Sequence, residues 1–192
     1  AISCLAQSNY SHTNCRLSTS AYTDISGTGT TIAMTNAQSG NSTTAQNIGF
    51  NFTFNGTVFT QFMIHADGIL RFGTAAPGAA TLIAVNPGSS YGGVFTSTST
   101  LFQNIVMPLF CDLVQGTAAP QYHVQVTGVA PDRVCTIQWK NVRDTDNSAS
   151  TLEHQFENME FQIKLYETTN NIEIVFGNWI PSANAAANRF ST

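Results

Sequence analysis

The stretch Gly49–Gly73, GFNFTFNGTVFTQFMIHADGILRFG, decides the fold because it holds three short runs of alternating apolar and polar residues. Two turn signals, Asn55-Gly56 and Ala66-Asp67-Gly68, separate these runs. Asn and Gly tolerate the positive φ angles that a two-residue hairpin turn requires. Alternate side chains of a strand share a face. The stretch therefore predicts an antiparallel meander whose inner face carries seven large apolar residues: Phe50, Phe52, Phe54, Phe62, Ile64, Leu70 and Phe72.

Similar alternation recurs nearer the C-terminus. In the run Val134–Val142 the side chains of Cys135, Ile137 and Trp139 share one face. The runs Phe161–Tyr166 and Ile172–Phe176 are joined through Glu167–Asn171 and predict a half-buried hairpin, with its apolar residues inward and Gln162, Lys164 and Glu173 outward.

Shorter strand signals complete the pattern. Strands are expected in residues 31–34, 82–85 and 123–126. The apolar run Ile105–Val114 reads as one strand buried on both faces, in which Pro108 requires a bulge or an edge position. No segment of ten or more residues keeps an apolar period of 3.6. The sequence thus predicts an all-β protein, an antiparallel β-sandwich of jelly-roll or immunoglobulin-like type.

Composition limits the classes of function. The 192 residues suit one domain, and 42% are hydrophobic, so a core can form. Only 9% are charged, against roughly 25% in ordinary soluble domains. Seven Lys plus Arg and a net charge of -4 exclude a basic footprint for nucleic acid. No apolar run approaches the ~20 residues of a membrane-spanning helix. Neither nucleic acid nor a membrane is expected as a partner.

The N-terminal region and the cysteines indicate an oxidising compartment. The chain opens at Ala1 without an initiator Met or a signal sequence, which we interpret as the result of signal cleavage. Of the four cysteines, Cys4 and Cys15 are expected to clip an N-terminal arm, residues 1–20, ahead of a sandwich domain at 21–192. Cys111 and Cys135 are expected to join neighbouring strands; the alternative is two buried free thiols.

Four Asn-X-Ser/Thr sequons are glycosylation candidates in an extracellular protein. They begin at Asn9, Asn41, Asn51 and Asn55.

Several runs together resemble a known family. IGFNFTFNGTVFTQFMIHADGILRFG, IVMPLFCDL, DRVCTIQWKNV and FQIKLYETTNNIEIVFG occur in an order and spacing similar to those of a β-sandwich domain in secreted surface proteins of Bacteroidetes-type bacteria. A more distant likeness is to nidogen-type extracellular domains. The resemblance covers residues 45–177 and implies an exported, adhesin-like module without catalytic residues. Cys111 replaces the first acid of the family's Asp-Asp pair, which leaves only Asp112.

The resemblance also raises an expectation for the C-terminal region. Domains of that kind continue into another strand after the position of Gly177, whereas this sequence proceeds as NWIPSANAAANRFST. A sheet edge without that strand exposes backbone groups that can pair with another chain.

The sequence holds no catalytic motif, so no enzyme activity and no cofactor are expected. His65 and Asp67 are interpreted as parts of the turn at Gly68. Weak calcium candidates are Asp144, Asp146 and Glu153, in a run that lacks the Gly and Glu of an EF-hand loop. The alternative there is a solvated loop, and the nearby acidic cluster of Glu153, His154, Glu157 and Glu160 is likewise read as a solvated face.

Two function hypotheses follow. The first is an extracellular structural protein that self-associates into a surface fibre or layer, supported by the uncharged Ser/Thr/Asn-rich surface. The second is an adhesin module that contacts glycan or a host protein through the loop 74–100. Trp179 and Tyr91 are the candidate contact residues.

Overall fold

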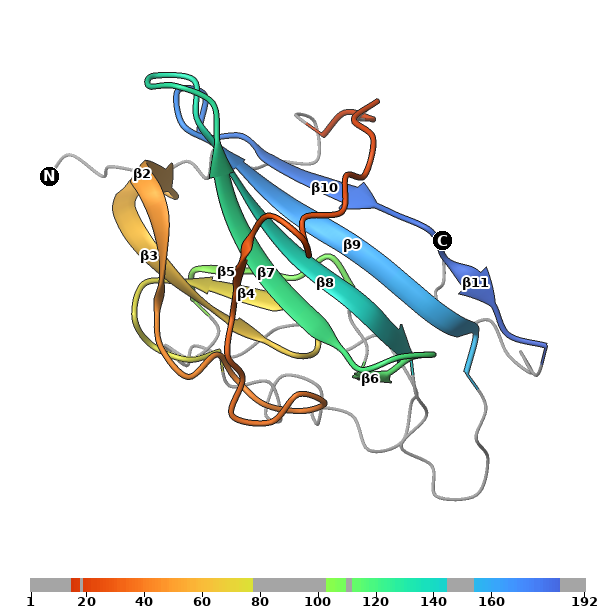
Figure 1. The fold of residues 1–192 in the computed structure, drawn as a ribbon. Helices are drawn as coiled ribbons and strands as arrows, with labels where there is room; N and C mark the ends of the chain where they lie inside the picture. Colours follow the sequence, from red (N-terminus) through yellow and green to blue (C-terminus); the bar gives the residue numbers. More distant parts are fainter. Residues whose placement is uncertain (1–14, 18, 78–102, 110–111, 145–153, 184–192) are drawn as a thin grey trace, which may run out of the picture.

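The chain folds as an all-β sandwich in a computed structural model, which describes residues 15–17, 19–77, 103–109, 112–144 and 154–183. Within these residues two antiparallel sheets pack on each other (Figure 1). The larger sheet has the order β1-β7-β8-β9-β10, with β6 beside β8 and β11 beside β9; the smaller one has the order β2-β3-β4-β5. The predicted antiparallel sandwich is confirmed.

The described strands are short at the edges and long in the middle of the larger sheet. Their bounds are β1 Thr30–Thr31, β2 Gln46–Phe54, β3 Thr57–His65, β4 Ile69–Phe72, β5 Ile105–Val106, β6 Leu113–Gln115, β7 Gln121–Thr127, β8 Val134–Asp144, β9 Phe156–Tyr166, β10 Ile172–Phe176 and β11 Ile180–Pro181.

The phenylalanine-rich meander forms the smaller sheet as predicted. Asn55 and Gly56 make the two-residue turn with φ angles of 48° and 79°, and Phe54 pairs with Thr57 across it. All seven predicted inner-face residues are buried, none more than 7% exposed. Both sheets contribute to one hydrophobic cluster, and the meander supplies one side of this core.

The larger sheet contributes the other half through β8 and β9. Cys135, Ile137 and Trp139 are fully buried on one face of β8, which confirms the predicted pattern. Trp139 stacks on Phe161 of β9 with ring centroids 5.1 Å apart. Aromatic stacking of this kind adds about 0.5–1.5 kcal/mol to the burial itself.

The turn between β3 and β4 lies inside the sandwich. His65 and Asp67 are each only 4% exposed. The carbonyl of His65 accepts a hydrogen bond from Trp139 Nε1 at 3.0 Å, and Asp67 Oδ1 accepts one from the backbone N–H of Leu113 at 3.1 Å. Gly68, with φ 77°, completes the turn against Phe161. The turn therefore fastens the smaller sheet to β6 and β8 of the larger one.

The apolar run 105–114 does not form one strand, which corrects the prediction. Its described ends belong to different sheets, β5 beside β4 and β6 beside β8. Pro108 lies between them and has no N–H to donate to a sheet ladder. The chain passes from one sheet to the other between these ends, and in the described part of the run Leu109 and Leu113 are buried while the other residues are partly exposed.

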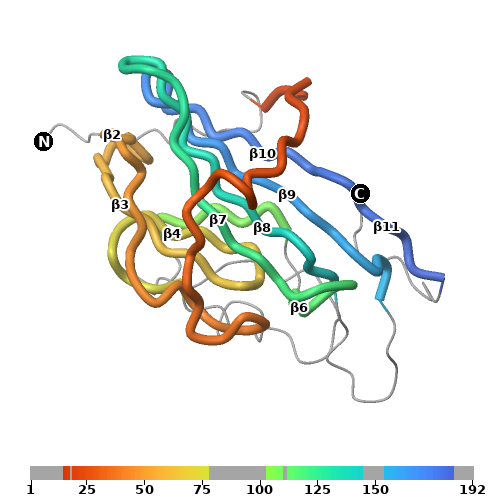
Figure 2. Tube along the Cα trace, viewed as in Figure 1, coloured from red at the N-terminus to blue at the C-terminus, as the bar shows by residue number. Residues whose placement is uncertain are grey.

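A strap formed by residues 21–29 crosses the outer face of the larger sheet (Figure 2). Gln162 Nε2 donates to the carbonyl of Thr23 and to Gln138 Oε1, which also accepts the backbone N–H of Ile25. Both glutamines are 0% exposed. Gln162 does lie on the outward face, but the prediction that it meets solvent there is wrong because the strap covers it.

Charged groups fasten the same strap at its middle. Lys140 Nζ donates to Asp24 Oδ2 and Gln138 Nε2 to Asp24 Oδ1, both from β8. Burial raises the pKa of Asp24, but the hydrogen bonds from Lys140, Ser26 and Gln138 together outweigh it and hold that pKa well below the usual 3.8.

Replacing Gly68 by Ala should destabilise the protein more than replacing Gly56. Both glycines have positive φ, so each substitution carries about 1 kcal/mol of backbone strain. A Cβ on Gly68 would lie 2.9 Å from Phe161 Cζ, whereas one on Gly56 meets nothing within 4 Å. Phe161 is locked against Trp139, so overpacking should cost Gly68→Ala a further ~1–3 kcal/mol in urea unfolding. Equal losses for the two variants would contradict the buried turn.

Asp24→Asn should lower stability at neutral pH and flatten its dependence on acid. A carboxyl whose folded pKa is depressed stabilises the fold above its unfolded value of 3.8, and this contribution is lost as pH falls below that value. Urea unfolding at pH 7, 5, 3 and 2 should show the variant and the parent converging below pH 3.8. Ser26→Ala, which keeps the carboxylate and removes only one of its hydrogen bonds, is the control and should retain most of the acid dependence. Parallel curves for Asp24→Asn and the parent would count against the strap's role.

Candidate functional site

The predicted His65–Asp67 pair serves the turn. His65 Nδ1 lies 3.1 Å from Asp67 Oδ2 and 3.2 Å from the backbone nitrogen of Asp67. The other carboxylate oxygen of Asp67 accepts the N–H of Leu113. Both side chains are therefore engaged in holding buried backbone, as the interpretation of Asp67-Gly68 as a turn indicates.

Asp144, the first calcium candidate, is fully buried and binds backbone. Its two carboxylate oxygens accept the N–H groups of Gln155 at 2.7 Å and Phe156 at 2.9 Å, which fastens the start of β9 to the end of β8. The other two candidates, Asp146 and Glu153, lie outside the described residues. Among the residues that are described, no three His, Cys, Asp or Glu side chains group as metal ligands do.

The neighbouring cluster around His154 is only partly a solvated face. His154 is 7% exposed, which corrects the prediction for that residue. Its Nε2 lies 3.0 Å from Glu157 Oε2, and Arg143 Nη1 lies 3.0 Å from the same Nε2 and 3.1 Å from Nδ1. The hydrogen bonds from His154 and Ser182 hold the pKa of Glu157 below its ordinary value. The cluster fastens β8 to β9 and to Ser182, just after β11.

The cysteines divide between described and undescribed parts of the chain. Cys135 is a buried free thiol, and burial raises its pKa to about 12. Its predicted partner Cys111 lies outside the described residues, so the structure does not support that disulfide. Cys15 is exposed, and Cys4 also lies outside the described part.

The sequons differ in accessibility. Asn51 in β2 and Asn55 in the β2–β3 turn are exposed. Asn41 has its side-chain oxygen buried, and its backbone bridges to His65, which makes it the poorer acceptor. Asn9 lies outside the described residues. Glycosylation stays a prediction that Asn51 and Asn55 fit best.

The predicted contact residues are less available than expected. Trp179 is half-buried, donates its Nε1 hydrogen to the carbonyl of Glu160 at 3.0 Å and packs edge-on against Phe156 and Phe176. Tyr91 and the loop 74–100 lie outside the described residues, except for 74–77. Trp139, expected in the core, is there.

An exposed apolar strip, the β10–β11 edge, runs along one side of the larger sheet. Ile174 and Phe176 of β10 are 38% and 51% exposed, and Ile180 of β11 is 42% exposed. Ile174 pairs with Ile163 and Phe176 with Phe161, so these side chains lie on the inner face. The alternation is as predicted, but the prediction that these residues are buried is wrong because β10 flanks the sandwich beyond β9.

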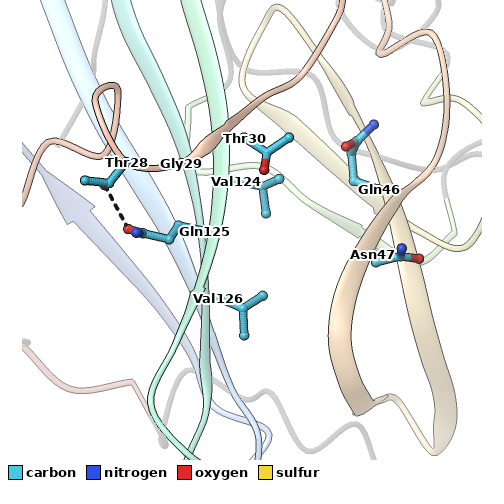
Figure 3. A pocket seen from close by; sticks show the side chains of 8 residues that line it. All are labelled: Thr28, Gly29, Thr30, Gln46, Asn47, Val124, Gln125 and Val126. Atoms are coloured by element: carbon cyan, nitrogen blue, oxygen red, sulfur yellow. Dashed lines mark hydrogen bonds between the residues drawn. The ribbon is translucent and has the colours of Figure 1, made fainter.

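At the opposite edge of the same sheet an open groove of about 420 Å³ separates β7 from β2 (Figure 3). Val124, Val126 and Thr30 lie on one side of it, with Gln46 and Asn47 across from them. Val126 is 41% exposed although it lies on the core-facing side of β7. Thr28 Oγ1 donates to Gln125 Oε1 at the rim, and Gly29 completes the lining, in which no residue is charged.

Sequence reasoning missed this groove. Its residues come from the strap, β1, β2 and β7, and none belongs to a motif. The available signal was the composition, since a chain with 9% charged residues leaves uncharged amides and hydroxyls on its surface.

The structure is therefore an all-β sandwich with an exposed apolar strip at one edge of the larger sheet and an uncharged groove at the other. In a comparison with protein families, the model described as NIDO related matches residues 12–191, and the chain belongs to this family. This match confirms the nidogen-type likeness, and the family is typical of extracellular proteins. The likeness to bacterial surface proteins stays a prediction. No curated protein and no solved structure matches the chain.

In the described part of the chain, no helix has the length and apolarity needed to cross a membrane.

Cys135 should resist alkylation in the folded protein and react once the protein is unfolded, without any reductant. Burial and the raised pKa of about 12 keep the native thiol protonated and out of reach. Iodoacetamide labelling at pH 8, with and without denaturant and followed by peptide mass spectrometry, measures this. A sample denatured with reductant gives full labelling as the control. Labelling that requires reductant would establish a disulfide to Cys135 instead.

Proposed function

We propose that the protein is an extracellular structural subunit whose copies associate edge to edge into a fibre. The observation that carries this is the β10–β11 edge, where Ile174 and Phe176 are exposed on the inner face of the sheet and Ile180 of β11 is exposed as well. The family supports the extracellular setting. The uncharged surface supports close contact between identical chains, because little charge has to be desolvated.

An exposed apolar edge strand is a template for pairing with another chain. Proteins that remain single guard such edges with Lys, Pro or an inward-pointing charge. At β10 the one charged residue is Glu173, which already accepts a hydrogen bond from the hydroxyl of Tyr166. Burying these side chains in a contact between copies yields about 25 cal/mol per Å² of apolar surface.

The β2 edge of the smaller sheet, in contrast, is guarded. On β2, the carbonyl of Gly49 accepts a hydrogen bond from Arg133 Nη1, and the N–H of Thr53 donates to Asn170 Oδ1, both at 2.7 Å. Arg133 is held in place by Glu167, whose carboxylate binds its Nε and Nη2. These contacts occupy backbone groups that a foreign strand would need.

An adhesin module is the second candidate, and the uncharged groove favours it. Amide and hydroxyl groups around an apolar floor suit a neutral ligand such as a saccharide. The groove replaces the loop 74–100 as the described surface for that role. In either case we propose a protein without catalytic activity.

Phe176→Lys should weaken self-association on the order of tenfold or more, because a lysine in the contact would bury an unpaired charge. Sedimentation velocity over a range of concentrations should show the parent growing into larger species and the variant remaining small. Val58→Lys, at a 57% exposed position of β3, is the matched control and should associate as the parent does. A parent protein that stays monomeric at every concentration would overturn the proposed function.

A further inference from the structure

We infer that the partner of the β10–β11 edge is the opposite edge of a second copy. Strand β10 of one molecule adds beside Gln125–Thr127 of β7 in the next molecule. The apolar side chains of β10 then enter the groove between β7 and β2. This inference rests on the proposed function and names the surface that receives the edge. It assigns the groove to self-assembly.

The backbone of β7 offers a place for an added strand. β1 pairs with His123 and Val124 only, through Thr31 and Thr30. The remainder of β7, Gln125–Thr127, extends past β1 and pairs with β8 on its other side. An incoming strand can therefore continue the sheet from this part of β7, next to the groove.

Strand direction and face both agree with this pairing. β7, β8, β9 and β10 are successively antiparallel, so β10 runs opposite to β7. A copy displaced along the sheet without being turned over thus brings its β10 antiparallel to β7. The inner face of the larger sheet in the displaced copy also lies on the same side as the inner face of the first copy. Ile174 and Phe176 of the neighbour then arrive on the same side as Val126.

The two surfaces match in chemistry. The donor edge exposes Ile174 and Phe176, and Val124 and Val126 are the apolar residues that line the groove. Val126 is 41% exposed and is the side chain that such a contact would bury. All eight lining residues are uncharged, so no ion has to be desolvated when the groove is filled. Its amides already have partners within the chain, because Gln125 Oε1 accepts from Thr28, Gln46 Nε2 donates to Thr44 and Asn47 Oδ1 accepts from Gln61.

The competing arrangement pairs β10 with β10 of a second copy around a twofold axis. That contact is closed and ends at a dimer, and it leaves the groove empty. The head-to-tail contact is heterologous and open, so it continues from copy to copy. Because neighbouring strands twist by about 20–25°, the product is a twisted filament and not a flat layer.

The test combines two variants that each block one surface. Val126→Lys blocks the groove and Phe176→Lys blocks the donor edge, and each alone should stay monomeric in sedimentation velocity. Mixed in equal amounts they should form a heterodimer and nothing larger, since one keeps its groove and the other its β10. Val129→Lys, at an 82% exposed position in the β7–β8 turn, is the matched control and should form filaments.

The outcomes separate the two proposals. Two results would overturn the head-to-tail contact while leaving edge association intact. One is a Val126→Lys protein that associates as the parent does. The other is a mixture of the two folded variants that stays monomeric. A parent protein that never associates overturns the proposed function itself. Near-UV circular dichroism checks the fold of each variant, and Ile174→Lys replaces Phe176→Lys if the latter loses its contact with Trp179 and unfolds.

Discussion

The hydrogen bond from Trp139 Nε1 to the carbonyl of His65 ties the two sheets together in the middle of the sandwich. It exists because the β3–β4 turn is buried, and buried backbone groups need partners. The other groups of the turn are satisfied in the same way: Ala66 N–H donates to the carbonyl of Gly40, and Asp67 accepts from Leu113. The loop before β2 and the start of β6 are thereby placed by a single turn.

On the outer face of the larger sheet, buried polar side chains fill the space beneath the strap, as apolar side chains fill the core. A row of residues on adjacent strands, His123, Gln138 and Gln162, lies under the strap or beside it and is almost wholly buried. Burial lowers the pKa of His123, which is consistent with this cover. The hydrogen bonds of these amides attach the strap to the outer face of the sheet, so this face is covered although it is polar.

The edges of the two sheets differ in how far their backbone and apolar side chains are covered. Arg133 and Asn170 guard the edge of β2, while β10 shows bare apolar side chains and β7 extends past its short neighbour β1. A monomer would gain from guarding every edge. The uneven protection is physically reasonable if the open edges are used between copies, and it explains why the larger sheet ends in apolar side chains.

The sequence by itself determined the class of fold and the content of the core. The Asn55-Gly56 turn, the inner phenylalanines and the run around Trp139 follow from local rules, namely the positive φ of turn residues and the period of two in strands. These rules operate within a few residues and need no knowledge of neighbours.

Only the tertiary structure decided which side chains meet solvent. The outward-facing Gln162 is buried because a strap from more than a hundred residues away covers it, and Phe176 is 51% exposed on the inner face because β10 is an edge strand of the larger sheet. The groove at Val126 likewise depends on where β2 ends up relative to β7. Alternation fixes the face on which a side chain lies, but the covering of that face is set by long-range packing, which no local pattern encodes.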